Sequence, residues 1–130
     1  MAQIDYAKVV SFLEDPASHT PIPDRIERLE THGALIFLAG AFALKIKKPV
    51  VYAYMDFSSL DRRRRACQRE LEINRPHAPE IYLDVVAVTL EPGGELAIDS
   101  IGAPVEWCVR MRRFPQSDVL AEIADARSLD

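Results

Sequence analysis

The sequence has few of the residues that bind structural metals or form disulfides. Only two of its 130 residues are cysteines, Cys67 and Cys108, and it contains no C-x-x-C pair and no His/Cys spacing typical of zinc ligands. We therefore expect no structural zinc site. A reduced chain in the cytoplasm is the simplest interpretation.

The sequence also lacks an apolar run long enough to cross a bilayer, which takes about 20 residues. Its longest run, residues 34–44, is interrupted by Gly40 and followed by Lys45, Lys47 and Lys48. The N-terminal residues show no basic stretch followed by an apolar one. We therefore expect neither a signal peptide nor a membrane partner.

The composition indicates one globular domain with no general preference for polyanions. Hydrophobic residues make up 48% of the chain and charged residues 28%, with a formal net charge of -4 and a pI of about 5.4. These values permit a core without disulfides and do not suit the whole chain to nucleic acid. We expect a single domain over residues 1–130, with a helix and loop over 1–23, a sheet with a long helix over 24–115, and a last segment over 116–130.

Hydrophobic periodicity predicts an α+β fold. The expected elements are a helix over residues 4–13, strands over 24–30, 35–38 and 42–46, a long helix over 58–75, and strands over 81–90, 95–98 and 106–111. Because the turns between strands are too short for parallel crossovers, we expect an antiparallel sheet with one long helix packed on a face. The long helix should begin at Ser58, with Asp61 three residues on as in a capping box, and end before Pro76.

One lysine stands out from this pattern. Lys45 lies within an apolar strand, and burying an ammonium group is costly unless an anion is near. The long helix offers two carboxylates, Glu70 on its inward side and Glu72 about 200° further around the helix. Spacing alone leaves open the alternative that Lys45 is exposed on an edge strand and unrelated to Glu70.

Several sequence blocks resemble the bacterial aminoglycoside-phosphotransferase-like family, whose members often carry a second, P-loop ATP-binding domain downstream. The matching blocks are residues 30–32, 35–40, 43–50, 55–60, 62–63, 70–75, 78–83 and 109–115. The more specific of them read Lys-Ile-Lys-Lys-Pro-Val from Lys45 and Met-Arg-Arg-Phe-Pro from Met111. The resemblance implies the small, N-terminal lobe of a kinase-like fold.

The resemblance also implies roles for individual residues. Lys45 would bind the ATP phosphates, with Glu70 as its partner and Glu72 as the fallback. A turn above the phosphates would consist of Thr31, His32 and Gly33, and the hinge facing the adenine would include Arg110, Met111 and Arg112. The turn has only Gly33 where protein kinases have a Gly-rich loop, so tight cradling of phosphates is not expected.

The same resemblance shows what the sequence does not contain. None of its histidines, His19, His32 and His77, is followed two residues later by the aspartate of a His-x-Asp catalytic loop. Residues 116–130 would be the start of a truncated C-lobe, which normally supplies the catalytic and metal-binding aspartates. We therefore expect a nucleotide-binding lobe of a small-molecule phosphotransferase that is inactive alone and binds ATP and Mg weakly.

Two other functions are compatible with the sequence. A small lobe without its C-lobe would expose apolar surface, which favours self-association or docking of a partner by a non-catalytic module. The arginines at positions 62–65 and Arg69 could contact RNA, although a solvated helix face is the simpler interpretation. The phosphate acceptor cannot be named from the sequence.

Overall fold

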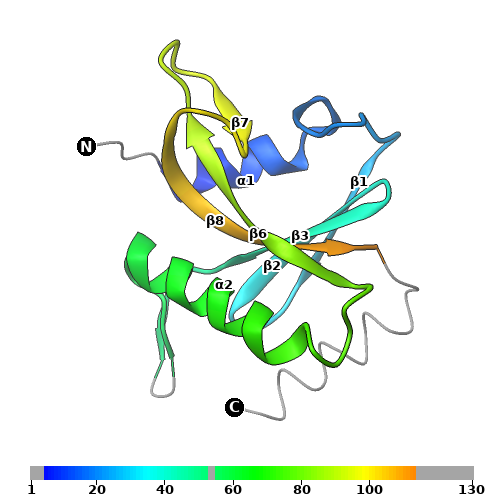
Figure 1. The fold of residues 1–130 in the computed structure, drawn as a ribbon. Coiled ribbons are helices and arrows are strands. Elements are labelled where there is room, and N and C mark those ends of the chain that lie inside the picture. Colours follow the sequence, from blue (N-terminus) through cyan, green and yellow to red (C-terminus); the bar gives the residue numbers. More distant parts are fainter. Residues whose placement is uncertain (1–4, 53–54, 114–130) are drawn as a thin grey trace.

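The computed structural model describes residues 5–52 and 55–113, in which two α-helices surround a curled antiparallel sheet (Figure 1). The elements are α1 (Tyr6–Glu14), the 3-10 helix η1 (Pro16–Ser18), β1 (Ile26–Glu30), β2 (Ala34–Ala39), β3 (Phe42–Lys47), β4 (Val51–Tyr52), β5 (Met55–Asp56), α2 (Leu60–Asn74), β6 (Tyr82–Leu90), β7 (Leu96–Ile98) and β8 (Ala103–Arg112).

The main sheet has six strands in the order β1-β2-β3-β8-β6-β7, and every neighbouring pair is antiparallel. The tight turn from β2 to β3 uses Gly40, whose φ of 61° is a left-handed value that favours glycine. Since β8 lies between β3 and β6, the last described strand returns to the middle of the sheet. The expected α+β class and antiparallel sheet are confirmed.

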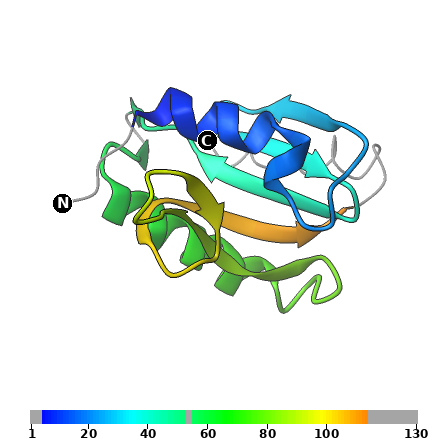
Figure 2. The same ribbon diagram turned by 90° about the horizontal axis from the view of Figure 1, so that it is seen from above.

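The two faces of the sheet carry different halves of the core because successive strand residues point to opposite sides. Leu44 and Ile46 of β3 pack with Val9 and Leu13 of α1. Ala43, which directly precedes Leu44, packs on the other face in the cluster that contains Cys67 of α2. The helices α1 and α2 therefore cover opposite faces (Figures 1 and 2).

The N-cap of α2 lies one residue later than the sequence indicated. The N-cap is Ser59, whose hydroxyl accepts a hydrogen bond from the Arg62 amide at 3.1 Å. Ser58 instead donates its hydroxyl to Asp56, at 2.6 Å. The expected capping box at Ser58 is therefore wrong, because a nearer carboxylate takes that hydroxyl and leaves the cap to the next serine.

Two further features differ from the expected arrangement. The sequence predicted one packed helix, but α1 also buries Val9 and Leu13, which are 1% and 0% exposed. The small β4–β5 hairpin was not predicted. The expected segment over residues 116–130 lies outside the described residues. Within the described ranges, no helix combines the length and apolarity needed to cross a membrane.

Candidate functional site

Lys45 lies near the middle of the sheet with its side chain on the face covered by α2. Strand alternation directs Leu44 and Ile46 to the α1 face and Ala43, Lys45 and Lys47 to the α2 face. Both lysine side chains are largely buried, with 8% and 10% of their surfaces exposed. The alternative of an exposed Lys45 on an edge strand is therefore wrong: β3 is an interior strand, paired with β2 and β8.

Glu70 of α2 joins both lysines to the helix. Its Oε2 atom lies 3.0 Å from the Lys45 Nζ atom, and its Oε1 atom accepts a hydrogen bond from the Lys47 Nζ atom. The Glu70 side chain is 12% exposed, whereas the fallback residue Glu72 is exposed. The predicted pairing of Lys45 with Glu70 is therefore present, and Lys47 is a second partner that sequence reasoning did not assign.

The charges around Glu70 keep it ionised. Burial alone would raise the pKa of its carboxyl group, but attraction by Lys47 and then Lys45, together with their hydrogen bonds, lowers it from 4.5 to about 2. A carboxylate between two ammonium groups holds them in place without needing a proton at neutral pH. The cluster of Lys45, Lys47 and Glu70 is thus a preformed arrangement of charge on one face of the sheet.

Neighbouring groups fix both ends of this cluster. The ring of Phe57 lies 5.7 Å from the Lys47 Nζ atom, a cation–π distance. The Tyr6 hydroxyl donates to the Lys47 carbonyl oxygen at 3.1 Å, which connects α1 to the end of β3. On α2, the Asn74 side chain donates to the Glu70 carbonyl oxygen at 2.8 Å. The strand and the helix that carry the two lysines and the glutamate are therefore held in place by several further contacts.

The expected turn at Thr31, His32 and Gly33 joins β1 to β2 at the end of the sheet where β3 finishes. Ala34 pairs with Lys47 in the strand register, so the turn lies beside the Lys47 end of the cluster. Thr31 is buried and its amide donates to the Ala34 carbonyl oxygen at 2.9 Å, while His32 is exposed. The Gly33 carbonyl oxygen accepts from the Lys48 amide at 2.8 Å.

The residues expected at a hinge lie within β8 instead. Arg110 and Arg112 pair with Leu44 and Phe42 of β3, so both lie on the face opposite Lys45. Met111 pairs with Ala43 on the Lys45 face and is fully buried. The Arg112 amide donates to the Ile81 carbonyl oxygen at 2.8 Å. Arg110 and Met111 are in register with both β3 and β6, and Arg112 with β3, and the adenine-facing role of their backbone stays a prediction.

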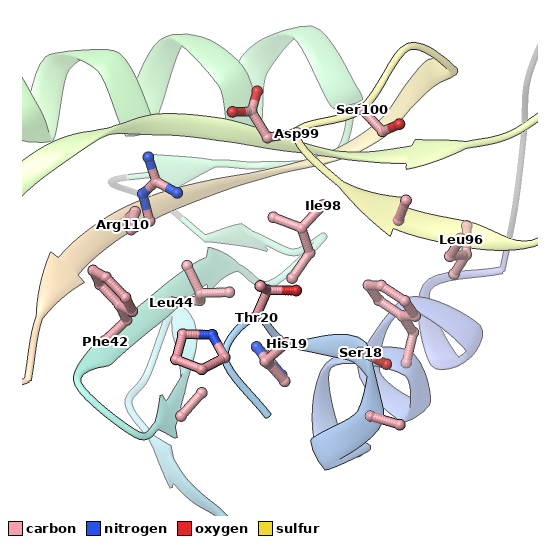
Figure 3. Close-up of a pocket in the computed structure, with 15 residues that line it drawn as sticks. Ser18, His19, Thr20, Phe42, Leu44, Leu96, Ile98, Asp99, Ser100 and Arg110 are labelled. Carbon is pink, nitrogen blue, oxygen red and sulfur yellow. The ribbon is translucent and has the colours of Figure 1, made fainter. Parts of the chain in front are cut away.

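Arg110 belongs to a different environment on the α1 face. Its guanidinium forms a bidentate pair with Asp84, with Nε and Nη2 at 2.8 Å and 2.6 Å from the two carboxylate oxygens. Figure 3 shows Arg110 beside Leu44 and Phe42 at a cavity of about 590 Å³ that His19 and Ile98 also line. The sheet separates this cavity from Lys45. The structure therefore does not bring Arg110 together with Lys45 and Glu70.

Sequence reasoning missed a buried ion pair near the start of α2. The Arg63 Nε atom lies 2.9 Å and 3.1 Å from the two carboxylate oxygens of Glu106, and the side chains are 11% and 1% exposed. A signal was present, because Arg63 precedes Cys67 by four residues and so lies on the inward stripe of the helix. The neighbouring arginines fit the solvated face that was expected, since Arg62, Arg64 and Arg65 are exposed.

The described residues do not form a metal centre. Across residues 5–52 and 55–113, no three histidine, cysteine, aspartate or glutamate side chains come together in a way that could hold a metal ion. Both cysteines are buried thiols. What the site offers chemically is therefore a pair of positioned ammonium groups, suited to binding an anion such as a phosphate.

Comparison with known proteins gives relatives without a stated activity. No family model matches the chain, and no solved structure matches it. Among curated proteins it is similar to the uncharacterized proteins Rv2004c and MT2060 of Mycobacterium tuberculosis and Mb2027c of Mycobacterium bovis. Each is 37% identical over 108 residues, which is 82% of this chain and 20% of the relative. The chain thus spans about a fifth of the length of the curated relatives it matches.

Proposed function

We propose that this chain is the nucleotide-binding lobe of a kinase-like small-molecule phosphotransferase, in which Lys45 contacts the phosphates of ATP and Glu70 holds Lys45 in place. The observation that carries the proposal is the buried Lys45–Glu70 pair, with 3.0 Å between Nζ and Oε2. Protein kinases use a lysine on their third strand paired with a glutamate on the following helix for this purpose.

The order of elements supports the same proposal. Lys45 lies on β3, the third strand of the chain, and α2 with Glu70 is the next helix. After this helix the chain forms β6 and β7 and then returns as β8, which lies beside β3. A turn, residues 31–33, lies at the end of the sheet next to Lys47, where a lobe of this type places the loop above the phosphates.

The proposal assigns phosphate binding to this chain and leaves the transfer step to other groups. Lys45 and Lys47 fit the charge of a triphosphate, and ATP would supply the transferable phosphoryl group. Among the described residues, no cluster of histidine, cysteine, aspartate or glutamate side chains could hold Mg. The sequence also contains no His-x-Asp motif to supply a catalytic base.

A titration of the chain with ATP followed by amide NMR tests this function. We expect weak binding, with Kd of about 1 mM, and shifts at residues around Lys45 that adenosine does not reproduce, since the phosphates carry the recognition. Lys45→Met should weaken binding by at least about tenfold. Lys8→Met is the matched control, because Lys8 is exposed on α1.

Two results would contradict the proposal. One is the absence of any ATP-dependent shift in the wild-type chain at about 10 mM ATP. The other is equal binding by the wild type and Lys45→Met. Repeating the titration with and without Mg shows whether the ion contributes through the nucleotide.

The other expected functions stay predictions. Self-association through an apolar surface would need a contiguous patch, but the exposed large apolar side chains of the described part, Ile22, Val51, Ile73 and Ile101, come from four separate segments. RNA binding by Arg62–Arg65 would have to compete with existing partners, since Arg62 pairs with Asp56 and Arg65 with Asp61. Neither observation favours these functions over phosphate binding.

A further inference from the structure

We propose that Arg63 is a positioning residue: its ion pair with Glu106 fixes α2 against the sheet at the distance where Glu70 reaches Lys45 and Lys47. This inference rests on the proposed function only for the role of Lys45 and Lys47 in binding phosphates. The positioning role of Arg63 is supported by the contacts between α2 and the sheet, whatever the lysines bind.

Arg63 lies on the inward side of α2, where its side chain is 11% exposed. Arg63 and Glu70 are seven residues apart, so they lie on nearly the same side of α2 and about 10 Å apart along its axis. Cys67, between them on the same stripe, is 0% exposed and its Sγ atom lies 3.7 Å from the Trp107 carbonyl oxygen. The inward side of α2 is thus polar at both ends and apolar at its centre.

Arg63 contacts both β8 and the segment that leads into α2. Its Nε atom bonds to both carboxylate oxygens of Glu106, and its Nη1 atom donates to the Phe57 carbonyl oxygen at 2.8 Å. Glu106 lies on β8 outside the part of that strand paired with β3, which starts at Cys108. Arg63 therefore ties three parts of the chain together: the helix, β8 and the segment leading into the helix.

Phe57 connects Arg63 to Lys47. The residue whose carbonyl oxygen it holds, Phe57, is the same residue whose ring lies 5.7 Å from the Lys47 Nζ atom. Glu70, further along the same helix face, bonds to that Nζ atom. Lys47 therefore has two contacts that depend on the position of α2: the Phe57 ring, which Arg63 holds, and the Glu70 carboxylate. If the ion pair of Arg63 were lost, α2 would be held less firmly and both contacts of Lys47 would loosen.

The test measures lysine reactivity, which does not depend on nucleotide binding. The wild-type chain and variants are acetylated with sulfo-NHS-acetate, and mass spectrometry resolves the rates at Lys8, Lys45, Lys47 and Lys48. Lys8 is exposed on α1 and serves as the reference, while Lys48, paired with Glu30, reports general loosening. The double variant R63M/E106L removes the ion pair but keeps side chains that can pack.

We expect folded R63M/E106L to be acetylated about tenfold faster than wild type at Lys47 and Lys45, relative to Lys8, with Lys48 unchanged. In R63K, the charge is kept but a single ammonium cannot span Glu106 and Phe57 together, so a smaller rise is expected. Arg65→Met, which removes an exposed pair with Asp61, should leave all rates unchanged. Should R63M/E106L fail to fold, R63K decides the question.

Unchanged ratios at Lys45 and Lys47 in the folded variants would overturn the inference, as would an equal rise at Lys48. An ATP titration of the same variants separates this inference from the proposed function. If R63M/E106L is acetylated faster but the wild type does not bind ATP, Arg63 is still a positioning residue and the proposed nucleotide binding is wrong. If wild type and R63M/E106L bind ATP equally and are acetylated at the same rates, the positioning role of Arg63 is wrong.

Discussion

Arg63 and Glu70 lie on the same inward side of α2, and each forms a largely buried ion pair with a different strand of the main sheet. Arg63 pairs with Glu106 of β8, and Glu70 pairs with Lys45 and Lys47 of β3. The helix therefore presents a positive group to a carboxylate at one end and a carboxylate to two positive groups at the other. Helix docking and the geometry of the candidate site are consequently linked.

Removing the carboxylate of Glu70 should destabilise the fold strongly. Glu70→Ala takes a shared partner from two largely buried ammonium groups, which costs about 3–5 kcal/mol in comparable cases. Urea denaturation measures the free energy of unfolding. Glu72→Ala is the matched control, because Glu72 is exposed on the same helix and should change stability by less than about 0.5 kcal/mol. Equal losses in the two variants would contradict a buried role for Glu70.

The pH dependence of stability should carry the signature of Glu70. Its pKa is lowered from 4.5 to about 2, so the stabilisation it gives is complete above pH 4.5 and is lost as the pH falls toward 2. The expected loss is on the order of 3 kcal/mol, measured by urea denaturation at a series of acidic pH values. Glu70→Gln should lack this component.

Glu106 titrates with the opposite sign in acid. Burial raises its pKa, a shift that Arg63 only partly offsets, so its protonation favours the folded state as the pH falls. The wild-type profile alone therefore mixes two effects. Subtracting the Glu70→Gln profile isolates Glu70, and a flat difference between pH 4.5 and 2 would show that its pKa is not lowered.

Much of the sheet could be predicted because its signals are local. The alternation of Leu44 and Ile46 with Lys45 gives the strand and its two faces, and Gly40 gives the turn before it. Helical spacing places Glu70 next to the stripe that contains Cys67. Periodicity makes a meeting of Lys45 and Glu70 possible, but spacing alone left open an exposed Lys45, and the pair was assigned through the family resemblance.

The remaining features depend on contacts between distant parts of the chain. Glu106 is 43 residues from Arg63, and nothing in its own strand indicates that α2 would supply a guanidinium there. Arg110 was placed at the nucleotide by resemblance, but its side of the sheet is set by its register with Leu44. Register and partner choice emerge only when the strands are assembled, which is why the site was predicted in part.

Removing Arg63 should cost far more than removing an arginine two residues away. Arg63→Ala leaves the carboxylate of Glu106, which is 1% exposed, without its charged partner, and a loss of about 3–5 kcal/mol is expected. Arg65→Ala breaks a surface pair in which Arg65 and Asp61 are 68% and 66% exposed, worth about 0.3–0.5 kcal/mol. Thermal or urea unfolding of both variants provides the comparison, and similar stabilities would show that the buried pair adds nothing.

Cys67 should report the docking of α2 through its reactivity with a thiol reagent. Burial raises the pKa of its thiol to about 12, so little thiolate is available and the native chain should react with DTNB far more slowly than the unfolded chain. Cys108 is the internal reference, because it lies on β8 between β3 and β6 and does not depend on the helix alone. In Glu70→Ala or Arg63→Ala, peptide mapping should find labelling of Cys67 accelerated more than that of Cys108. Rapid labelling of Cys67 in the wild type would mean that the helix is not held against the sheet in solution.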